Sequence, residues 1–373
     1  MIMLVSPREL LNDTRLNFLI GSGASKPHFP TLGNIEKALT FSDNLKDEDR
    51  SRYAKMLCAR QYALQVIKPE LSVGPISSQN PDSEVYETLL GYEFLFGIMS
   101  KLVTARETPV TSKTVNVFTT NYDTCIEHAF EDLGVLYNDG FVGHMNPRFE
   151  LSLYGVSYRR QSLLYEFVSE IPSFNLFKLH GSLNWALEDR GIVLDRERRI
   201  ARKCCNLAEA IGRGCGIDVN DLDSYRNHVS SQGNCKLTPD EEEFLGSYNE
   251  LVLVSPTKKK FEQTLIDGNY YEMLRMMSNE LEKENALLCV VGFSFADEHI
   301  REIAGRALVQ NPTLTVVCFS YSENSADVIR AYDEFSHLPY GNLTFVTPDD
   351  VDREHVDIRA VAQYLKRAID ANA

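Results

Sequence analysis

Short apolar runs recur along the chain, and segments with the apolar spacing of helices separate them. Each run holds four to seven apolar or β-branched residues, which is typical of a strand buried on both faces of a sheet. The runs lie at residues 16–20, 114–118, 174–179, 251–254, 287–291, 313–319 and 343–346. This alternation predicts an α/β fold in which helices cover both faces of a doubly wound parallel sheet.

Two segments interrupt the alternation. Residues 41–110 show helical periodicity, whereas residues 186–248 are rich in charge, glycine and cysteine and show little apolar periodicity. We expect the first to add a helical layer and the second to add a loop-rich flap. Because no repeat, low-complexity tract or long linker divides the chain, the sequence predicts one domain over residues 1–373.

Composition restricts the functions that the chain can have. Its net charge of −15 argues against a bulk electrostatic grip on DNA or RNA, so we expect no direct nucleic-acid binding. No apolar run reaches the length of about 18 residues that a membrane span needs, and the first residues do not form a secretory signal. We therefore expect a cytoplasmic protein with no membrane segment.

The cysteine pattern does not predict a metal site. The chain has eight cysteines, and four of them lie in the second interrupting segment. These four are Cys204, Cys205, Cys215 and Cys235. Adjacent cysteines followed by single distant ones do not match the paired spacing of structural zinc sites, so we expect no metal.

The first candidate site is a glycine-rich turn after the run at 16–20. It consists of Gly21, Ser22, Gly23, Ala24 and Ser25. Glycine lets the backbone turn sharply and approach a ligand, and successive free amides can hold a diphosphate. The turn lacks the third glycine of the dinucleotide fingerprint, so a tight connection from strand to helix explains it equally well on its own.

The second candidate site follows the run at 114–118. It contains Thr120, Asn121 and Asp123, and a helical segment comes directly after it. Asn121 can orient a water molecule or a ligand amide without carrying charge, so it is the candidate catalytic amide. Helix capping by Thr120 or Asp123 is the alternative interpretation.

The third candidate site is His180, which stands beside a glycine after the run at 174–179. An imidazole has an ordinary pKa near 6.5, which suits a general base. A histidine in this position is also commonly a hydrogen-bonded structural residue.

The fourth candidate site follows the run at 287–291. Gly292 ends the strand, and Ser294 and Asp297 precede a helix. This arrangement can hold a ribose, or Asp297 can cap the helix.

Taken together, the four sites resemble the sirtuin-like domain of prokaryotes over residues 14–305. The matching motifs are Gly-Ser-Gly-Ala-Ser at 21–25, Thr-Thr-Asn-Tyr-Asp at 119–123, Leu-His-Gly-Ser at 179–182 and Gly-Phe-Ser-Phe-Ala-Asp-Glu-His-Ile at 292–300. The resemblance implies a Rossmann-like sheet that binds NAD+ across its switch point. It also implies that Asn121 and His180 lie at the nicotinamide ribose.

The differences from sirtuin deacetylases affect the expected reaction. Those enzymes carry Gln-Asn-Ile-Asp where this chain has Thr-Asn-Tyr-Asp at 120–123, and they carry two Cys-x-x-Cys pairs that this chain lacks. The variant motifs resemble the sirtuin-like enzymes that hydrolyse NAD+ in bacterial defence against phage. The resemblance therefore implies an effector that depletes NAD+ and causes abortive infection, with nicotinamide and ADP-ribose as products.

The residues suit that chemistry. Cleavage of the nicotinamide–ribose bond passes through an oxocarbenium-like state, and the leaving group is already positively charged, so no general acid is needed. His180 could accept a proton from water or a ribose hydroxyl, Asn121 could hold the water, and the turn at 21–25 could hold the diphosphate.

Three alternatives remain at this stage. The chain could be a protein deacylase or ADP-ribosyl transferase, or a non-catalytic sensor that binds NAD+ or ADP-ribose. A nuclease is the least favoured, because no paired acidic motif follows a strand.

Partners are implied only by the resemblance. Stand-alone members of this kind resemble the partners of HerA-type hexameric ATPases, and other members act with short Argonaute proteins. We therefore expect a homo-oligomer that docks on a HerA-type ATPase, with a short Argonaute as the second choice.

Overall fold

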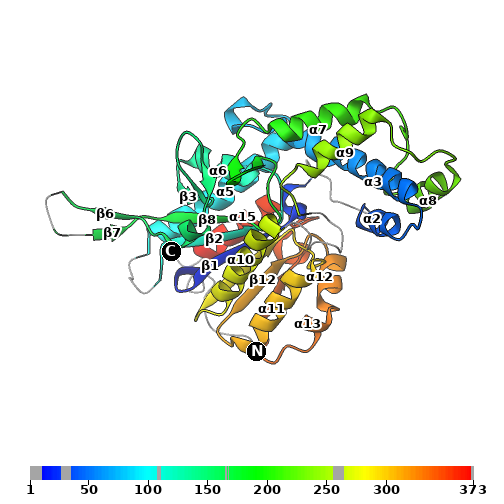
Figure 1. Cartoon of the computed structure of the whole chain (residues 1–373). Helices are drawn as coiled ribbons and strands as arrows, with labels where there is room; N and C mark the ends of the chain where they lie inside the picture. The colour runs from blue at the N-terminus through cyan, green and yellow to red at the C-terminus, as the bar shows by residue number, and fades with distance from the viewer. Residues whose placement is uncertain are drawn as a thin grey trace.

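A seven-stranded parallel sheet forms the centre of the protein (Figure 1). The computed structural model describes residues 11–26, 35–106, 111–163, 166, 168–254 and 264–370. The strands follow the order β13-β12-β11-β1-β2-β8-β3. Their bounds are β1 (Arg15–Ile20), β2 (Thr114–Thr119), β3 (Leu136–Asn138), β8 (Ser173–Lys178), β11 (Ala286–Val291), β12 (Thr315–Phe319) and β13 (Leu343–Val346). The predicted α/β, Rossmann-like fold is confirmed.

Helices cover both faces of the sheet, because the strand residues alternate between two apolar layers. In β1, Phe18 faces one layer and Leu19 faces the other. The first layer is covered by α5 (Glu84–Thr104), α6 (Cys125–Leu133) and α15 (Ile358–Asp370). The second is covered by α10 (Thr264–Leu281) and α11 (Glu298–Gln310). Within the described part of the chain, none of the helices has both the length and the apolar character needed to cross a membrane.

The chain reverses its direction across the sheet at β1. From β1 it proceeds to β2 and β8 on one side, and later it continues through β11, β12 and β13 on the other. The carboxyl ends of β1 and β11 therefore flank the switch point, where open α/β sheets bind their ligands.

One apolar run does not form a strand of this sheet. Residues 251–254 make a single antiparallel bridge, between Leu253 and Gly181. They pack beside the third motif instead, so the expectation of a strand there was wrong.

The two interrupting segments pack against each other and form a helical module beside the sheet (Figure 1). We define the module as residues 35–71 and 199–251. It contains α2 (Ile35–Asp43), α3 (Glu48–Tyr62), the π-helix η2 (Ala63–Ile67), α4 (Lys68–Glu70), α7 (Arg199–Ala210), α8 (Leu222–Ser231) and α9 (Pro239–Asn249). Tyr53, Tyr225 and Phe244 are fully buried in its core.

The module corrects two expectations about these segments. The second was expected to be loop-rich, but it contains three helices. Its helical signal is weak because the buried face of α7 consists of small residues such as Ala201, Cys204 and Ala208. In the first, α5 is not part of an added layer, since it packs on the sheet.

The remaining elements are short. A four-stranded antiparallel sheet has the order β4-β5-β10-β9, and a separate hairpin of β6 and β7 projects from the body of the molecule (Figure 1). These strands are β4 (Phe141–Val142), β5 (Arg148–Phe149), β9 (Trp185–Glu188), β10 (Gly191–Leu194), β6 (Arg159–Gln161) and β7 (Val168–Glu170). The short helices are η1 (Ser22–Ser25), η3 (Ile76–Ser78), η4 (Leu151–Gly155), α12 (Glu323–Arg330), α13 (Asp333–Ser336) and α14 (Pro348–Val351).

Four buried asparagines form a ladder across neighbouring strands. Asn17, Asn116 and Asn175 are directly paired in register on β1, β2 and β8, and Asn138 of β3 is paired with Asn175. Asn116 donates to the side-chain oxygen of Asn17 at 3.0 Å and accepts from the side-chain nitrogen of Asn175 at 2.9 Å. Asn138 donates to Asn175 at 3.4 Å. Because buried amides must be paired, the ladder fixes the register of these strands.

Replacement of Asn116 by alanine should destabilise the fold. The variant Asn116→Ala leaves a buried acceptor on Asn17 and a buried donor on Asn175 without their partner. We expect the free energy of unfolding to fall by about 2–4 kcal/mol in urea denaturation. Asn249→Ala, at an exposed position at the end of α9, is the control and should change it by less than about 0.5 kcal/mol. Equal effects of the two substitutions would show that the ladder does not set stability.

Candidate active site

The four motifs follow four neighbouring strands, β11, β1, β2 and β8. Since these strands are parallel, their carboxyl ends meet at one edge of the sheet. The structure therefore brings all four sequence-predicted sites to the same edge.

At the switch point, the glycine-rich turn packs directly on the backbone of the fourth motif. Gly21 donates its amide to the carbonyl of Val291 at 3.0 Å, and Gly23 donates to the carbonyl of Gly292 at 2.9 Å. A Cβ on Gly21 would lie 2.6 Å from the oxygen of Gly292, and Gly292 itself has φ +62°. Only glycine fits this approach at both positions.

The turn uses several of its own amides. In addition to those of Gly21 and Gly23, the amide of Ala24 donates to the carbonyl of Gly21 at 3.0 Å. Ser22 lies exposed at the start of η1. These three amides serve the fold, and diphosphate binding by this turn stays a prediction.

Ser25 is the centre of a buried polar group that contains Asn121. Its hydroxyl donates to Oδ2 of Asp123 at 2.9 Å and accepts from Nδ2 of Asn121 at 3.2 Å. It also lies 2.8 Å from the hydroxyl of Tyr92, which is supplied by α5. No sequence pattern indicated Tyr92, because a tyrosine in an apolar helix is ordinarily a packing residue.

The backbone of the second motif is held from the sheet. Thr120 donates its amide to the carbonyl of Ile20 at 3.1 Å, and the amide of Asn121 donates to the hydroxyl of Thr119 at 3.0 Å. Asp123, one residue before the N-cap Thr124, accepts from the amide of Cys125, the first residue of α6, at 3.1 Å. Asp123 therefore contacts both the start of α6 and Ser25, while the N-cap position itself is occupied by Thr124.

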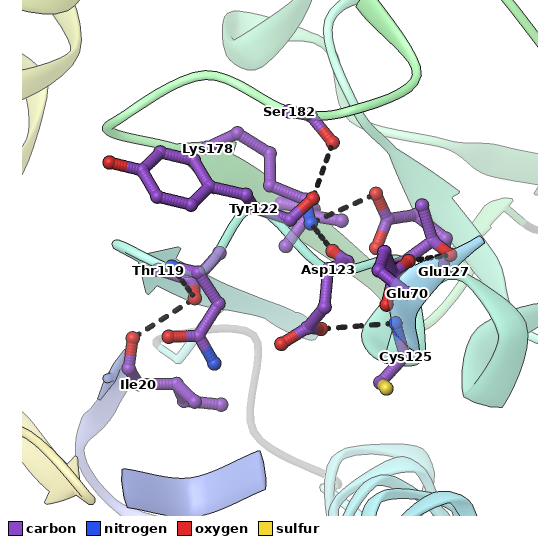
Figure 2. Close-up of polar contacts among 12 residues, drawn as sticks. Ile20, Glu70, Thr119, Tyr122, Asp123, Cys125, Glu127, Lys178 and Ser182 are labelled. Atoms are coloured by element: carbon purple, nitrogen blue, oxygen red, sulfur yellow. Dashed lines mark hydrogen bonds and ion pairs between the residues drawn. The ribbon is translucent and has the colours of Figure 1, made fainter. Parts of the chain in front are cut away.

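Three ionisable side chains lie beside this motif, two of them buried and one, Glu127, partly buried (Figure 2). Lys178, at the end of β8, donates to the backbone carbonyl of Asp123 and forms an ion pair with Glu127 at 3.1 Å. Burial raises the pKa of Glu127 despite this attraction. Glu70, the third, comes from the helical module.

Glu70 connects the module to the site. Its Oε1 accepts from both the amide and the hydroxyl of Thr124 at 2.7 Å. Arg198 approaches the same oxygen at 3.6 Å and donates to the backbone carbonyl of Glu70 at 2.9 Å. Burial, followed by the neighbouring Asp123, raises the pKa of Glu70 to about 8. Its contact partner is distant in sequence, so no local pattern could have predicted its place here.

His180 lies in a second polar group. Its Nε2 is 3.1 Å from Oδ2 of Asp297, and its ring centroid is 6.4 Å from that of Tyr122 and 5.8 Å from that of Tyr270. Asp297 is also the N-cap of α11, where it accepts from the amide of His299 at 3.0 Å. The third and fourth motifs are thus joined through side chains.

The third and fourth motifs also contain Gly181 and Ser294, and residues 251–254 pack beside the third motif. Gly181 has φ +84°, and the carbonyl of His180 accepts from the amide of Val254 at 2.8 Å, which anchors residues 251–254 beside the histidine. Ser294 is exposed, outside the hydrogen-bonded core of the site. The buried Phe295 follows it with φ +57°, which is unusual for a residue with a side chain.

The cysteines of the second interrupting segment are not gathered at this edge. Cys204, Cys205 and Cys235 are buried in the helical module, and the exposed Cys215 contacts Arg60 at 3.2 Å. In the part of the chain that the structure describes, no three His, Cys, Asp or Glu side chains are grouped so that they could hold a metal ion.

The raised pKa of Glu70 predicts a pH-dependent stability. The folded chain binds a proton at Glu70 that the unfolded chain releases, so stability falls as pH rises from about 4.5 to about 8. Between pH 5 and pH 8, we expect the wild type to lose about 1–3 kcal/mol of unfolding free energy relative to Glu70→Gln, which keeps the acceptor for Thr124. Urea unfolding at both pH values measures this. The exposed control Glu188→Gln should keep a constant difference from the wild type. A constant difference for Glu70→Gln as well would contradict the assignment.

Part of the chain matches the model of a known protein family. The model of the SIR2-like domain matches residues 115–203, which begin in β2, end in α7 and contain Asn121 and His180. No curated protein matches the chain. The matched segment, placed at the carboxyl edge of a Rossmann-like sheet, supports a sirtuin-like family for this chain.

Proposed function

We propose that the chain is an NAD+ hydrolase that cleaves the bond between nicotinamide and ribose and releases nicotinamide and ADP-ribose. A SIR2-like domain fits an NAD-related function and is consistent with an NAD-dependent enzyme. The observation that carries the proposal is the pair formed by His180 and Asp297, which lies at the ligand-binding edge of the sheet near the motif of Asn121.

The pair gives His180 the properties of a general base. Asp297 accepts the hydrogen bond from Nε2, which selects the tautomer with the proton on that nitrogen and the basic lone pair on Nδ1. A carboxylate also stabilises the imidazolium that forms when the base takes a proton. Asp297 is itself held by the amides at the start of α11, so the imidazole is oriented before any substrate binds.

The reaction requires few other catalytic groups from the protein. The nicotinamide leaves as a neutral molecule from a cationic ring, so the site needs a positioned water and a base but no acid. In our proposal Asn121 holds the water and His180 takes its proton. The rings of Tyr122 and Tyr270 lie beside the imidazole, with centroids 6.4 and 5.8 Å from it, and in our proposal they shield it from bulk water.

Loss of either His180 or Asn121 should remove most activity. We expect His180→Ala and Asn121→Ala to lower kcat for nicotinamide release from NAD+ by about 100-fold or more, because general-base catalysis contributes a factor of about 10²–10⁴. Chromatographic assay of nicotinamide measures this, and melting temperature checks the fold. The control is His337→Ala, at an exposed histidine after α13, which should retain the wild-type rate.

Other outcomes would select other functions. Wild-type rates in both variants would contradict the proposed roles. NAD+ binding by the wild type without nicotinamide release would contradict the hydrolase and favour a sensor, and transfer of label from NAD+ to a protein acceptor would favour an ADP-ribosyl transferase.

We further propose, from the family resemblance alone, a cytoplasmic role in anti-phage defence. In this role the enzyme is a homo-oligomer that docks on a HerA-type ATPase and depletes NAD+ when activated. The expected result is a mass above that of the monomer in light scattering at micromolar concentration, and nicotinamide release that changes when the ATPase is added. A monomer at every concentration would contradict the oligomer.

A further inference from the structure

A group of four buried side chains, joined by hydrogen bonds through Ser25, lies next to the proposed site. Its members are Ser25, Tyr92, Asn121 and Asp123. Ser25 and Tyr92 are fully buried, and Asn121 and Asp123 are only 5% and 7% exposed. The four side chains come from the first motif, the second motif and helix α5. Water therefore cannot replace a partner that Ser25 or Tyr92 loses.

The number of hydrogens on each group determines the direction of each hydrogen bond around Ser25. A serine hydroxyl has one hydrogen and two lone pairs, and a carboxylate can only accept. Ser25 must therefore give its hydrogen to Asp123 at 2.9 Å. Its two lone pairs then accept from Asn121 at 3.2 Å and from the hydroxyl of Tyr92 at 2.8 Å. Every position on the serine oxygen is filled.

This count also determines the orientation of the Asn121 amide. If the amide turned over, its oxygen would face a serine oxygen with no hydrogen left to offer. The side-chain nitrogen therefore faces Ser25, and Oδ1 is directed away from it. Oδ1 is buried, and among the residues that the structure describes it has no hydrogen-bond partner.

We infer that Tyr92 is a positioning residue that, through Ser25, holds the carbonyl oxygen of Asn121 ready to accept a hydrogen bond from the attacking water. This inference rests on the proposed function for the identity of the water. Tyr92 does not itself touch substrate. Its hydroxyl keeps Ser25 pointed at Asp123, and Ser25 keeps the Asn121 amide from turning.

Ring packing along helix α5 holds the side chain of Tyr92 in place. The ring of Tyr92 is stacked on that of Phe96, with centroids 6.3 Å apart and an interplanar angle of 13°. Phe96 in turn packs against Phe18 of the sheet at 6.4 Å. Replacement of Tyr92 by phenylalanine keeps this packing and removes only the hydroxyl, so the variant isolates one hydrogen bond.

The first test is kinetic. We expect Tyr92→Phe to lower kcat for nicotinamide release by about 10-fold and to change KM for NAD+ by less than about 2-fold, because the hydroxyl acts on the reacting water and not on substrate binding. The matched control is Tyr225→Phe, which removes an equally buried hydroxyl from the helical module and should keep the wild-type kcat. A wild-type kcat in Tyr92→Phe would overturn the inference.

A double-mutant cycle tests the path through Ser25. If Tyr92 acts through Ser25, Tyr92→Phe should cost nothing further in a Ser25→Ala background. Additive losses would show that Tyr92 acts by another route and would also overturn the inference.

The second test does not depend on hydrolase activity. The side-chain amide hydrogens of Asn121, assigned by NMR from their loss in Asn121→Ala, should exchange with solvent at least about 10-fold faster in Tyr92→Phe than in the wild type or Tyr225→Phe. Unchanged exchange would overturn the inference even in an active enzyme. Wild-type protein that releases no nicotinamide would instead overturn the proposed function, and the exchange rates would still decide the role of Tyr92.

Discussion

The arrangement of the site depends on the register of three central strands. Asn17, Asn116 and Asn175 are paired across β1, β2 and β8, and each amide is buried in the sheet. A slip of one residue would turn a buried amide to the opposite face and leave its neighbours without a partner. The ladder therefore forces these strands to end level with one another, and the first three motifs leave the sheet together.

Close backbone contact at the switch point also restricts which residues can follow β1 and β11. Gly23 and Gly292 meet where a Cβ on Gly23 would lie 2.8 Å from the oxygen of Gly292. The glycine-rich turn at the switch point would therefore need the same backbone amides for two purposes, packing against the fourth motif and binding a diphosphate. Its glycines are required for packing whether or not a diphosphate binds, so a glycine-rich sequence alone is weak evidence for a nucleotide site.

The sequence predicted those features that local patterns encode. The runs at 16–20, 114–118 and 287–291 match β1, β2 and β11, because strands buried on both faces are mostly apolar. It predicted helices in the first interrupting segment but not the three in the second, where the buried face of α7 consists of small residues, and it did not predict the contacts of Tyr92 and Glu70. Both of these side chains act through partners far away in sequence, and only the folded topology brings them together.

The buried ionisable side chains beside the second motif are informative because burying them is energetically costly. Lys178 and Glu70 are almost completely buried, and apolar side chains in such positions commonly give equal or greater stability. Their contacts converge on the backbone of Asp123 and Thr124, on either side of one peptide bond. Lys178 and Glu70, a carboxyl group whose pKa is raised to about 8 by burial, contact the carbonyl and the amide of this peptide bond and so hold its position after Asn121. Polar contacts of this kind commonly cost stability but fix local geometry, which is what the candidate site at this edge of the sheet would require.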